Sequence, residues 1–269
     1  LVVSNHVSWL DIVTVHAARH VRFVSKSNVQ HWPWVGTLAN GAGTLLSGER
    51  RLSEKGMPLN HHLGCSVFAE YATVSRRSVV KIDPAVPLDE AALFGCAVLT
   101  GVGAVVNTAK VRVGASVAVI GLGGVGLAAL LGAQAAGARH IVAVDLSEDK
   151  LEQARALGAT HTVNAGDPEA RERIRTITDG GVEYAFEFAG SIQALDLAYR
   201  ITRRGGTTVT AGLPPSTATL PLAAVNLVAE ERTLKGSYIG TCVPSRDVPR
   251  YIALYRQGRL PVDKLLTGR

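Results

Sequence analysis

The sequence predicts an α/β fold in which a doubly wound parallel sheet has helices on both faces. β-branched runs alternate with helical segments throughout residues 116–211, and this alternation is typical of such a sheet. In addition, the strand-like run from Ser116 to Ile120 leads into three glycines and then into an apolar helical segment. A strand, a glycine-rich turn and a helix in this order predict a dinucleotide-binding site.

The glycine turn has the pattern G-x-G-x-x-G, and each glycine has its own physical role. Gly121 permits the tight turn out of the strand, Gly123 lets a pyrophosphate approach the backbone, and Gly126 lets the helix lie close to the sheet. The free N–H groups at the start of the helix face the phosphate charge. The predicted cofactor-binding stretch consists of Gly121, Leu122, Gly123, Gly124, Val125 and Gly126.

A second strand, Ile141 to Asp145, ends in a carboxylate about 20 residues beyond the turn, as the motif requires. A carboxylate at this position accepts hydrogen bonds from the ribose 2′-hydroxyl and repels a 2′-phosphate, so we expect NAD rather than NADP. Lys150 is expected to cover the adenosine ribose. The alternative role of Asp145 is that of a turn residue.

The remaining elements follow the same alternation. Helices are expected at 125–136, 151–157, 170–178, 192–201 and 246–257, and strands at 162–164, 184–188 and, after a turn at Gly205–Gly206, at 207–211. Before the glycine turn we expect strands at 68–75 and 79–82, a short helix from Pro87 and an apolar helical stretch over 95–103.

The overall composition is that of a globular protein, with 269 residues, 47% hydrophobic and 19% charged. The net charge of +6 comes from scattered basic pairs, which argues against nucleic-acid binding. The cysteines are odd in number and far apart in the sequence (Cys65, Cys96 and Cys242), which predicts no disulfide framework and favours a cytoplasmic location. The longest apolar runs are too short for a membrane span.

His6 and Asp11 lie in Asn5-His6-x-Ser8-x-x-Asp11, where a histidine base and an orienting carboxylate could activate a hydroxyl. With Phe23-Val-Ser-Lys26 and Trp32-Pro33-Trp34-Val-Gly36, the motif resembles the lysophosphatidate (glycerolipid) acyltransferases over residues 1–46. The resemblance implies acyl transfer to a glycerol hydroxyl by His6 and Asp11. The family's later Glu-Gly-Thr block is absent, which leaves open that the pair only caps a helix. Because the chain starts on Leu1 inside a strand-like run, we expect a fragment.

From about residue 57 the chain resembles a different family, the zinc-type medium-chain alcohol dehydrogenases. The resemblance rests on the glycine turn with Asp145 and on several shorter stretches: His61-His62-Leu-Gly-Cys-Ser-Val-Phe-Ala-Glu-Tyr, Gly95-Cys96 with Thr100-Gly101, Glu187-Phe-Ala-Gly190, Ala211-Gly-Leu-Pro-Pro215 and Lys235-Gly-Ser-Tyr. It implies a Rossmann nucleotide domain and remnants of a mostly β catalytic domain. A join of two unrelated pieces is expected near 47–57.

The resemblance assigns roles to individual residues. Cys96 matches a ligand of the catalytic zinc, and Thr100 lies where the family packs a side chain against the nicotinamide. His62 and Leu63 fall in the segment that lines the substrate pocket. Gly212 and Leu213 match the loop whose backbone meets the nicotinamide amide.

The chain also departs from this family. The other two zinc ligands, the proton-relay hydroxyl and the four-cysteine structural zinc lobe have no counterpart here, so the zinc site is expected to be incomplete. The alternative role for Cys96 is that of a small buried apolar side chain.

These patterns predict five segments: 1–46 acyltransferase-like, 47–60 a linker or seam, 61–97 a partial catalytic (GroES-like) domain, 98–240 the Rossmann domain, and 241–269 a C-terminal helix and truncated tail. The resemblance favours an NAD-dependent oxidoreductase acting on a small alcohol or aldehyde and forming a homo-oligomer through its Rossmann domain. The alternatives are an NAD-binding module without catalysis and a glycerolipid acyltransferase.

Overall fold

The computed structural model describes residues 50, 52–59 and 79–266 of the chain. These residues belong to two compact units, of which the larger contains 84–266. The predictions for His6, Asp11, His62, Leu63 and the strand at 68–75 lie outside the described residues.

The smaller unit contains an antiparallel hairpin within the segment expected to be a linker. It is formed by β1 (Leu52–Glu54) and β2 (Met57–Leu59), and its turn residues Lys55 and Gly56 have φ values of 50° and 80°. Two consecutive positive φ values match the twist of the paired strands. The strand expected at 79–82 is not formed. The segment expected to pair with it lies outside the described residues.

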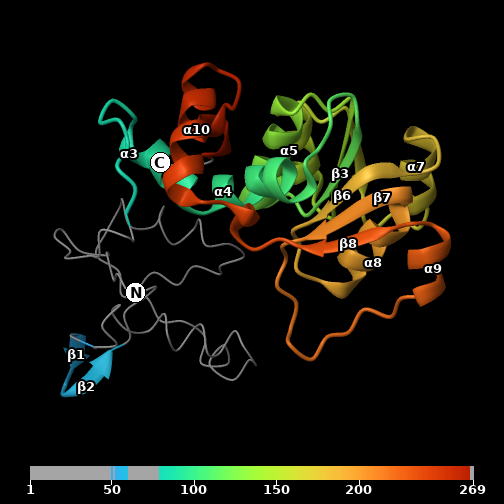
Figure 1. The fold of residues 1–269 in the computed structure, drawn as a ribbon, viewed down its shortest axis with the longest axis horizontal. Helices are drawn as coiled ribbons and strands as arrows, with labels where there is room; N and C mark the ends of the chain where they lie inside the picture. Colours follow the sequence, from blue (N-terminus) through green and yellow to red (C-terminus); the bar gives the residue numbers. More distant parts are fainter. Residues whose placement is uncertain (1–49, 51, 60–78, 267–269) are drawn as a thin grey trace. The chain divides into compact units, whose positions relative to one another are not determined.

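The larger unit is organised around a six-stranded parallel sheet with the order β5-β4-β3-β6-β7-β8 (Figure 1). The strands are β3 (Ser116–Ile120), β4 (His140–Asp145), β5 (His161–Asn164), β6 (Val182–Glu187), β7 (Thr202–Thr210) and β8 (Thr233–Gly236). The predicted doubly wound parallel sheet is therefore confirmed.

Helices cover both faces of the sheet. Those after the first strand are α5 (Gly124–Ala135), α6 (Glu148–Ala156), α7 (Ala170–Ile177), α8 (Ile192–Ile201), α9 (Ala224–Ala229) and α10 (Pro244–Arg256). Ala118 and Ile120 of β3 pack in one core with Ile174 of α7 and Ile201 of α8. The alternate residue Val119 faces α5, because successive side chains of a strand point to opposite faces.

Strand β7 differs from its prediction. It begins at Thr202, so Gly205 and Gly206 lie inside it. The pairing with β6 shifts register between Val182 and Tyr184, and Gly205 has φ 69°. Between the pairs formed by Val182 and Tyr184, β7 has three more residues than β6, so the strand contains an irregular stretch that includes both glycines. Glycine inside a strand often marks such an irregularity and is easily mistaken for a turn.

At the edge of the sheet where the strands begin, α7 connects to β6 through an exposed turn. Asp179 and Gly180 have φ values of 50° and 95°, and both are exposed. A Cβ added to Gly180 would meet nothing within 4 Å. The chain therefore reverses here without burying its turn.

Before the sheet the chain forms α3 (Leu88–Ala91), a 3₁₀ turn (Ala92–Gly95), α4 (Ala97–Gly103) and a π-helical turn (Ala104–Ala109). Helix α4 packs on α5, and a Cβ on Gly101 would overlap the Val125 carbonyl. Within the described ranges no single helix is long and apolar enough to cross a membrane. The bent pair Leu88–Gly95 and Ala97–Ala109 meets that criterion by length and composition only.

Candidate cofactor site at the carboxyl edge of the sheet

The candidate site lies where the strand order reverses. Strand β3 pairs with β4 on one side and with β6 on the other, so the connections leave β3 and β6 in opposite directions. In open parallel sheets, ligands bind in the crevice at the carboxyl ends of the strands at such a point. The loop after β3 is the predicted glycine turn, and a Cβ on Gly121 would lie 2.6 Å from the Ala189 nitrogen in the loop after β6.

The three glycines of the turn differ in their surroundings. Gly121 has φ 87°, and a Cβ on Gly126 would overlap the Gly121 carbonyl oxygen, so both glycines are required by the protein itself. Gly123 is exposed, with φ −70° and ψ −175°, and a Cβ there would meet nothing within 4 Å. The turn thus leaves open space beside Gly123.

Helix α5 begins directly at this open space. Its N-cap is Gly123, and no side chain caps its first turn. The Gly124 and Val125 side of the helix start is partly exposed, whereas the Leu122 side chain is fully buried. An uncapped helix start presents N–H groups and a partial positive charge to an anion. The surroundings fit a pyrophosphate group.

Asp145 ends β4 beside the glycine turn, where its carboxylate orders two loops. It accepts hydrogen bonds from the Leu122 N–H at 2.7 Å and the Ser147 N–H at 3.0 Å. The side chain stays partly exposed, and a carboxylate oxygen can accept more than one bond. Asp145 therefore has the position and the acceptor capacity to bind a ribose hydroxyl. The Lys150 ammonium lies 3.5 Å from the Gln153 side-chain oxygen, to which it donates.

The carboxylate of Glu187 joins the loop after β6 to the end of β7. This side chain is 1% exposed and accepts hydrogen bonds from the Gly190 N–H at 2.5 Å and the Thr210 hydroxyl at 2.6 Å. A Cβ on Gly212 would overlap the Gly190 nitrogen and lie 2.7 Å from Glu187 Oε2. Gly212 and Leu213 therefore lie directly against the loop after β6.

Cys96 and Thr100 occupy the first turn of α4. The Thr100 N–H donates to the Cys96 carbonyl at 2.8 Å, and Gly101, the next residue, packs against α5 near the glycine turn. Burial raises the pKa of the Cys96 thiol to about 11, partly opposed by a hydrogen bond with Thr100.

Among the described residues, no three histidine, cysteine, aspartate or glutamate side chains are grouped so that they could hold a metal ion. Cys96 is a free cysteine in these surroundings. The described part of the chain therefore does not fit a catalytic zinc site.

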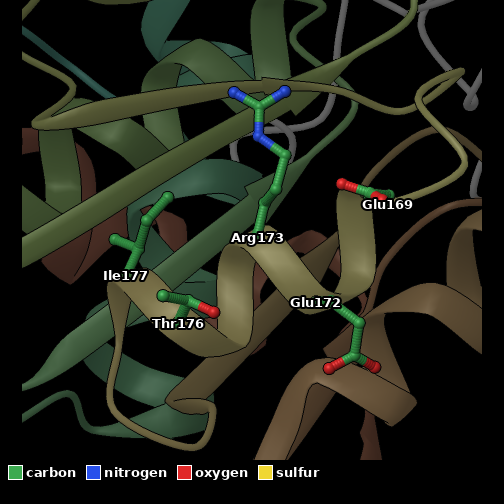
Figure 2. Close-up of a pocket in the computed structure, with 5 residues that line it drawn as sticks. All are labelled: Glu169, Glu172, Arg173, Thr176 and Ile177. Atoms are coloured by element: carbon green, nitrogen blue, oxygen red, sulfur yellow. The ribbon is translucent and has the colours of Figure 1, made fainter.

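A surface depression lies on helix α7. It is lined by Glu169, Glu172, Arg173, Thr176 and Ile177 (Figure 2). Arg173 is paired with Asp167 at 2.5 Å, so its charge is already compensated. None of these residues belongs to the predicted cofactor stretch, and we do not assign the cofactor to this depression.

Sequence reasoning did not single out two features of the carboxyl edge. Glu187 was noted only as part of a family stretch, because nothing in its local pattern shows that its partner Thr210 lies beside it. Ser237, directly after β8, donates its N–H to the Thr210 carbonyl at 2.8 Å and is buried. The edge position of Ser237 follows from the strand order, which requires the whole sheet.

The chain is similar to known proteins of two families. Residues 124–257 match the family described as zinc-binding dehydrogenase, and residues 1–58 match the acyltransferase family. The structure is similar to an alcohol dehydrogenase zinc-binding domain protein from Burkholderia ambifaria, with 35% identity and a TM-score of 0.79. It is also similar to benzyl alcohol dehydrogenase from Acinetobacter calcoaceticus, with 34% identity and a TM-score of 0.78.

A third similar structure is the alcohol dehydrogenase TADH from Thermus sp. ATN1, with 30% identity and a TM-score of 0.63. The match to the first two structures covers 84% of this chain but 62% and 61% of theirs, and the match to the third covers 70% of this chain and 53% of that protein. The chain thus spans less than two thirds of the length of these relatives.

Proposed function

Because its residues 124–257 match the zinc-binding dehydrogenases and its fold is that of alcohol dehydrogenases, we propose that this chain binds NAD and belongs to an oxidoreductase that interconverts an alcohol and its aldehyde. The relatives support an oxidoreductase-like family. The use of NAD and the catalytic activity of this chain are what we propose here.

The observation that supports NAD binding most strongly is the open space at Gly123, beside the uncapped start of α5. The protein gains nothing from the lack of a side chain there, since a Cβ would meet no neighbour. A glycine at such a place lets a ligand approach the backbone. The carboxylate of Asp145, on the adjacent strand end, adds the ribose contact and disfavours a 2′-phosphate.

Different residues along the carboxyl edge of the sheet would bind different parts of NAD. The backbone of Gly121–Gly126 would receive the pyrophosphate, Asp145 and Lys150 the adenosine ribose, and Gly212 and Leu213 the nicotinamide end, with Thr100 packed against it. When bound, NAD supplies the hydride acceptor for alcohol oxidation. His62 and Leu63 are proposed to line the substrate pocket.

A second candidate is NAD binding without catalysis. It is favoured because, within the described residues, Cys96 is not grouped with two further side chains that could complete a metal site. These residues alone would not hold a catalytic zinc ion. A chain of this kind would hold the cofactor but would not polarise a substrate oxygen.

A third candidate rests on the acyltransferase match over residues 1–58. There His6 and Asp11 would activate a glycerol hydroxyl for acyl transfer. Loss of acyl transfer in His6→Ala would identify this activity. For the dehydrogenase part we propose a homo-oligomer joined through the Rossmann domain, and the cysteine pattern supports a cytoplasmic location.

The test is a fluorescence titration of the full chain with NADH, followed by an assay of NAD reduction with benzyl alcohol, the alcohol named for one relative. Saturable binding with turnover is the expected result for the dehydrogenase. Binding without turnover, with or without added zinc, selects the second candidate. A lack of NADH binding at millimolar concentration overturns the proposal.

A further inference from the structure

We propose that Glu187 is a positioning residue for the nicotinamide end of the cofactor, an inference that rests on the proposed function. Its carboxylate ties the loop after β6 to Thr210 at the end of β7, directly before the loop that contains Gly212 and Leu213. It thereby fixes the backbone of Gly212 and Leu213.

Burying the Glu187 carboxyl group has a free-energy cost. Glu187 is 1% exposed, and in the described part of the chain no lysine or arginine forms an ion pair with it. A carboxyl group buried in this way is costly unless hydrogen bonds compensate it. Here the compensating donors are the Gly190 N–H and the Thr210 hydroxyl, at 2.5 and 2.6 Å. The buried side chain therefore links the loop after β6 to the end of β7.

The loops after β6 and β7 have a defined position along the carboxyl edge of the sheet. Strands β6 and β7 lie side by side (Figure 1), and the sheet order places β7 three strand spacings from β4, which is about 14 Å. Asp145 at the end of β4 would bind the adenosine ribose. A dinucleotide that crosses the switch point then places its other half at β6 and β7.

The backbone of Gly212 and Leu213 lies beside Glu187. The Gly212 N–H donates to the Glu187 carbonyl at 3.3 Å, and Gly212 packs on Gly190 without room for a side chain. In the described part of the chain the Leu213 N–H and carbonyl have no hydrogen-bond partner. Both groups are thus available to a polar ligand such as a carboxamide, provided that the loop keeps its place.

The experiment compares the affinities of the full chain for NADH and for ADP-ribose, which has no nicotinamide. The variants are Glu187→Gln, Glu187→Ala and Thr210→Val. The matched control is Glu183→Gln, a change on the same strand at the opposite edge of the sheet, where the carboxylate accepts from the Ser116 N–H at 2.9 Å. A thermal melt of each variant verifies folding.

We expect Glu187→Gln to raise the Kd for NADH by about tenfold, since hydrogen bonds to a charged group are weakened, while the Kd for ADP-ribose changes less than about twofold. Thr210→Val should act in the same direction, and Glu187→Ala more strongly. The emission of bound NADH should also lose its enhancement, because the nicotinamide is no longer held. If Glu187→Ala does not fold, the two milder variants still decide.

The positioning role is overturned if the Glu187 variants lose affinity for NADH and ADP-ribose equally. It is also overturned if Glu183→Gln weakens NADH binding while leaving ADP-ribose binding unchanged. If the unaltered chain binds neither ligand, the proposed function fails instead. The two failures are therefore distinguishable.

Discussion

At the scale of single residues, the glycine turn separates what the fold needs from what a ligand needs. Gly126 lies against the Gly121 carbonyl, and Gly121 has a positive φ, so both serve the chain itself. Gly123 has an ordinary φ and open surroundings. We therefore expect that, of the three glycines, Gly123 is the one whose replacement would affect NAD binding with little effect on the fold.

The pair Gly123→Ala and Gly126→Ala tests this separation. We expect Gly123→Ala to cost less than about 1 kcal/mol of unfolding free energy, as for a helix N-cap, but to weaken NADH binding at least about tenfold by crowding the pyrophosphate. Gly126→Ala should destabilise the protein by about 3 kcal/mol, because its Cβ overlaps backbone. Urea unfolding and NADH titration measure both effects. Unchanged NADH affinity in Gly123→Ala would contradict the site.

Asp145→Asn tests the choice of cofactor. The amide keeps the size of the side chain but removes the charge that repels a 2′-phosphate, so the ratio of the Kd for NADPH to that for NADH should fall about tenfold. The loss of one of the two loop contacts, to Leu122 or Ser147, should cost about 1–2 kcal/mol of stability. If the ratio stays the same, Asp145 serves only the turn.

The site residues that could be predicted from the sequence are those with local patterns. The glycines and Asp145 follow fixed spacings around one strand, turn and helix, so their neighbourhood is implied by the motif. Glu187 and Thr210 are brought together only by the pairing of β6 with β7. The raised pKa of Cys96 depends on burial by other segments, which no spacing reveals.

At the scale of elements, helix α10 begins at an ion pair whose carboxylate is buried. Asp247 is 1% exposed and pairs with Arg246, with distances of 2.7 and 2.8 Å between their atoms. It also accepts from the Val243 N–H at 2.8 Å, which anchors the first turn of the helix. The Arg246 guanidinium, followed by the Val243 N–H, lowers the pKa of the Asp247 carboxyl.

The lowered pKa makes the stability of this element depend on pH. A carboxyl whose pKa falls on folding stabilises the protein above its ordinary pKa of 3.8, and this contribution is lost as the pH falls through the folded value. We expect Asp247→Asn to cost about 1.5–3 kcal/mol at pH 7 and almost nothing at the acid end. Urea unfolding of both proteins from pH 7 downward measures the difference, and a constant difference would contradict this assignment.

The elements themselves were predicted well where their periodicity is strong. Strands β3 to β6 and helices α5 to α8 begin and end within a few residues of the prediction. The error at β7 arose because Gly205–Gly206 looks the same in sequence whether it turns the chain between two elements or lies in an irregular stretch within one strand. The hairpin at 52–59 was missed because its strands have three residues each, too few for an alternating pattern.

At the scale of the whole molecule, cofactor binding should stabilise the folded state. NADH at 100 times its Kd adds about 2.7 kcal/mol if it binds only the folded chain, which raises Tm by about 5–10 °C for a unit of this size. Differential scanning calorimetry with and without NADH measures the shift. Gly123→Ala, with a Kd at least about tenfold higher, should show at most about half of this shift at the same NADH concentration. An equal shift in that variant would mean that NADH binds elsewhere.

The sheet also has a second edge, where the strands begin, and it offers a place for engineering. The exposed turn at Asp179–Gly180 lies at that edge, on the far side from the candidate cofactor site. A short epitope or a dye-bearing peptide inserted between these two residues would therefore report on the protein without obstructing the nucleotide. The same turn gives a handle for tethering the molecule to a surface with its cofactor side facing the solution.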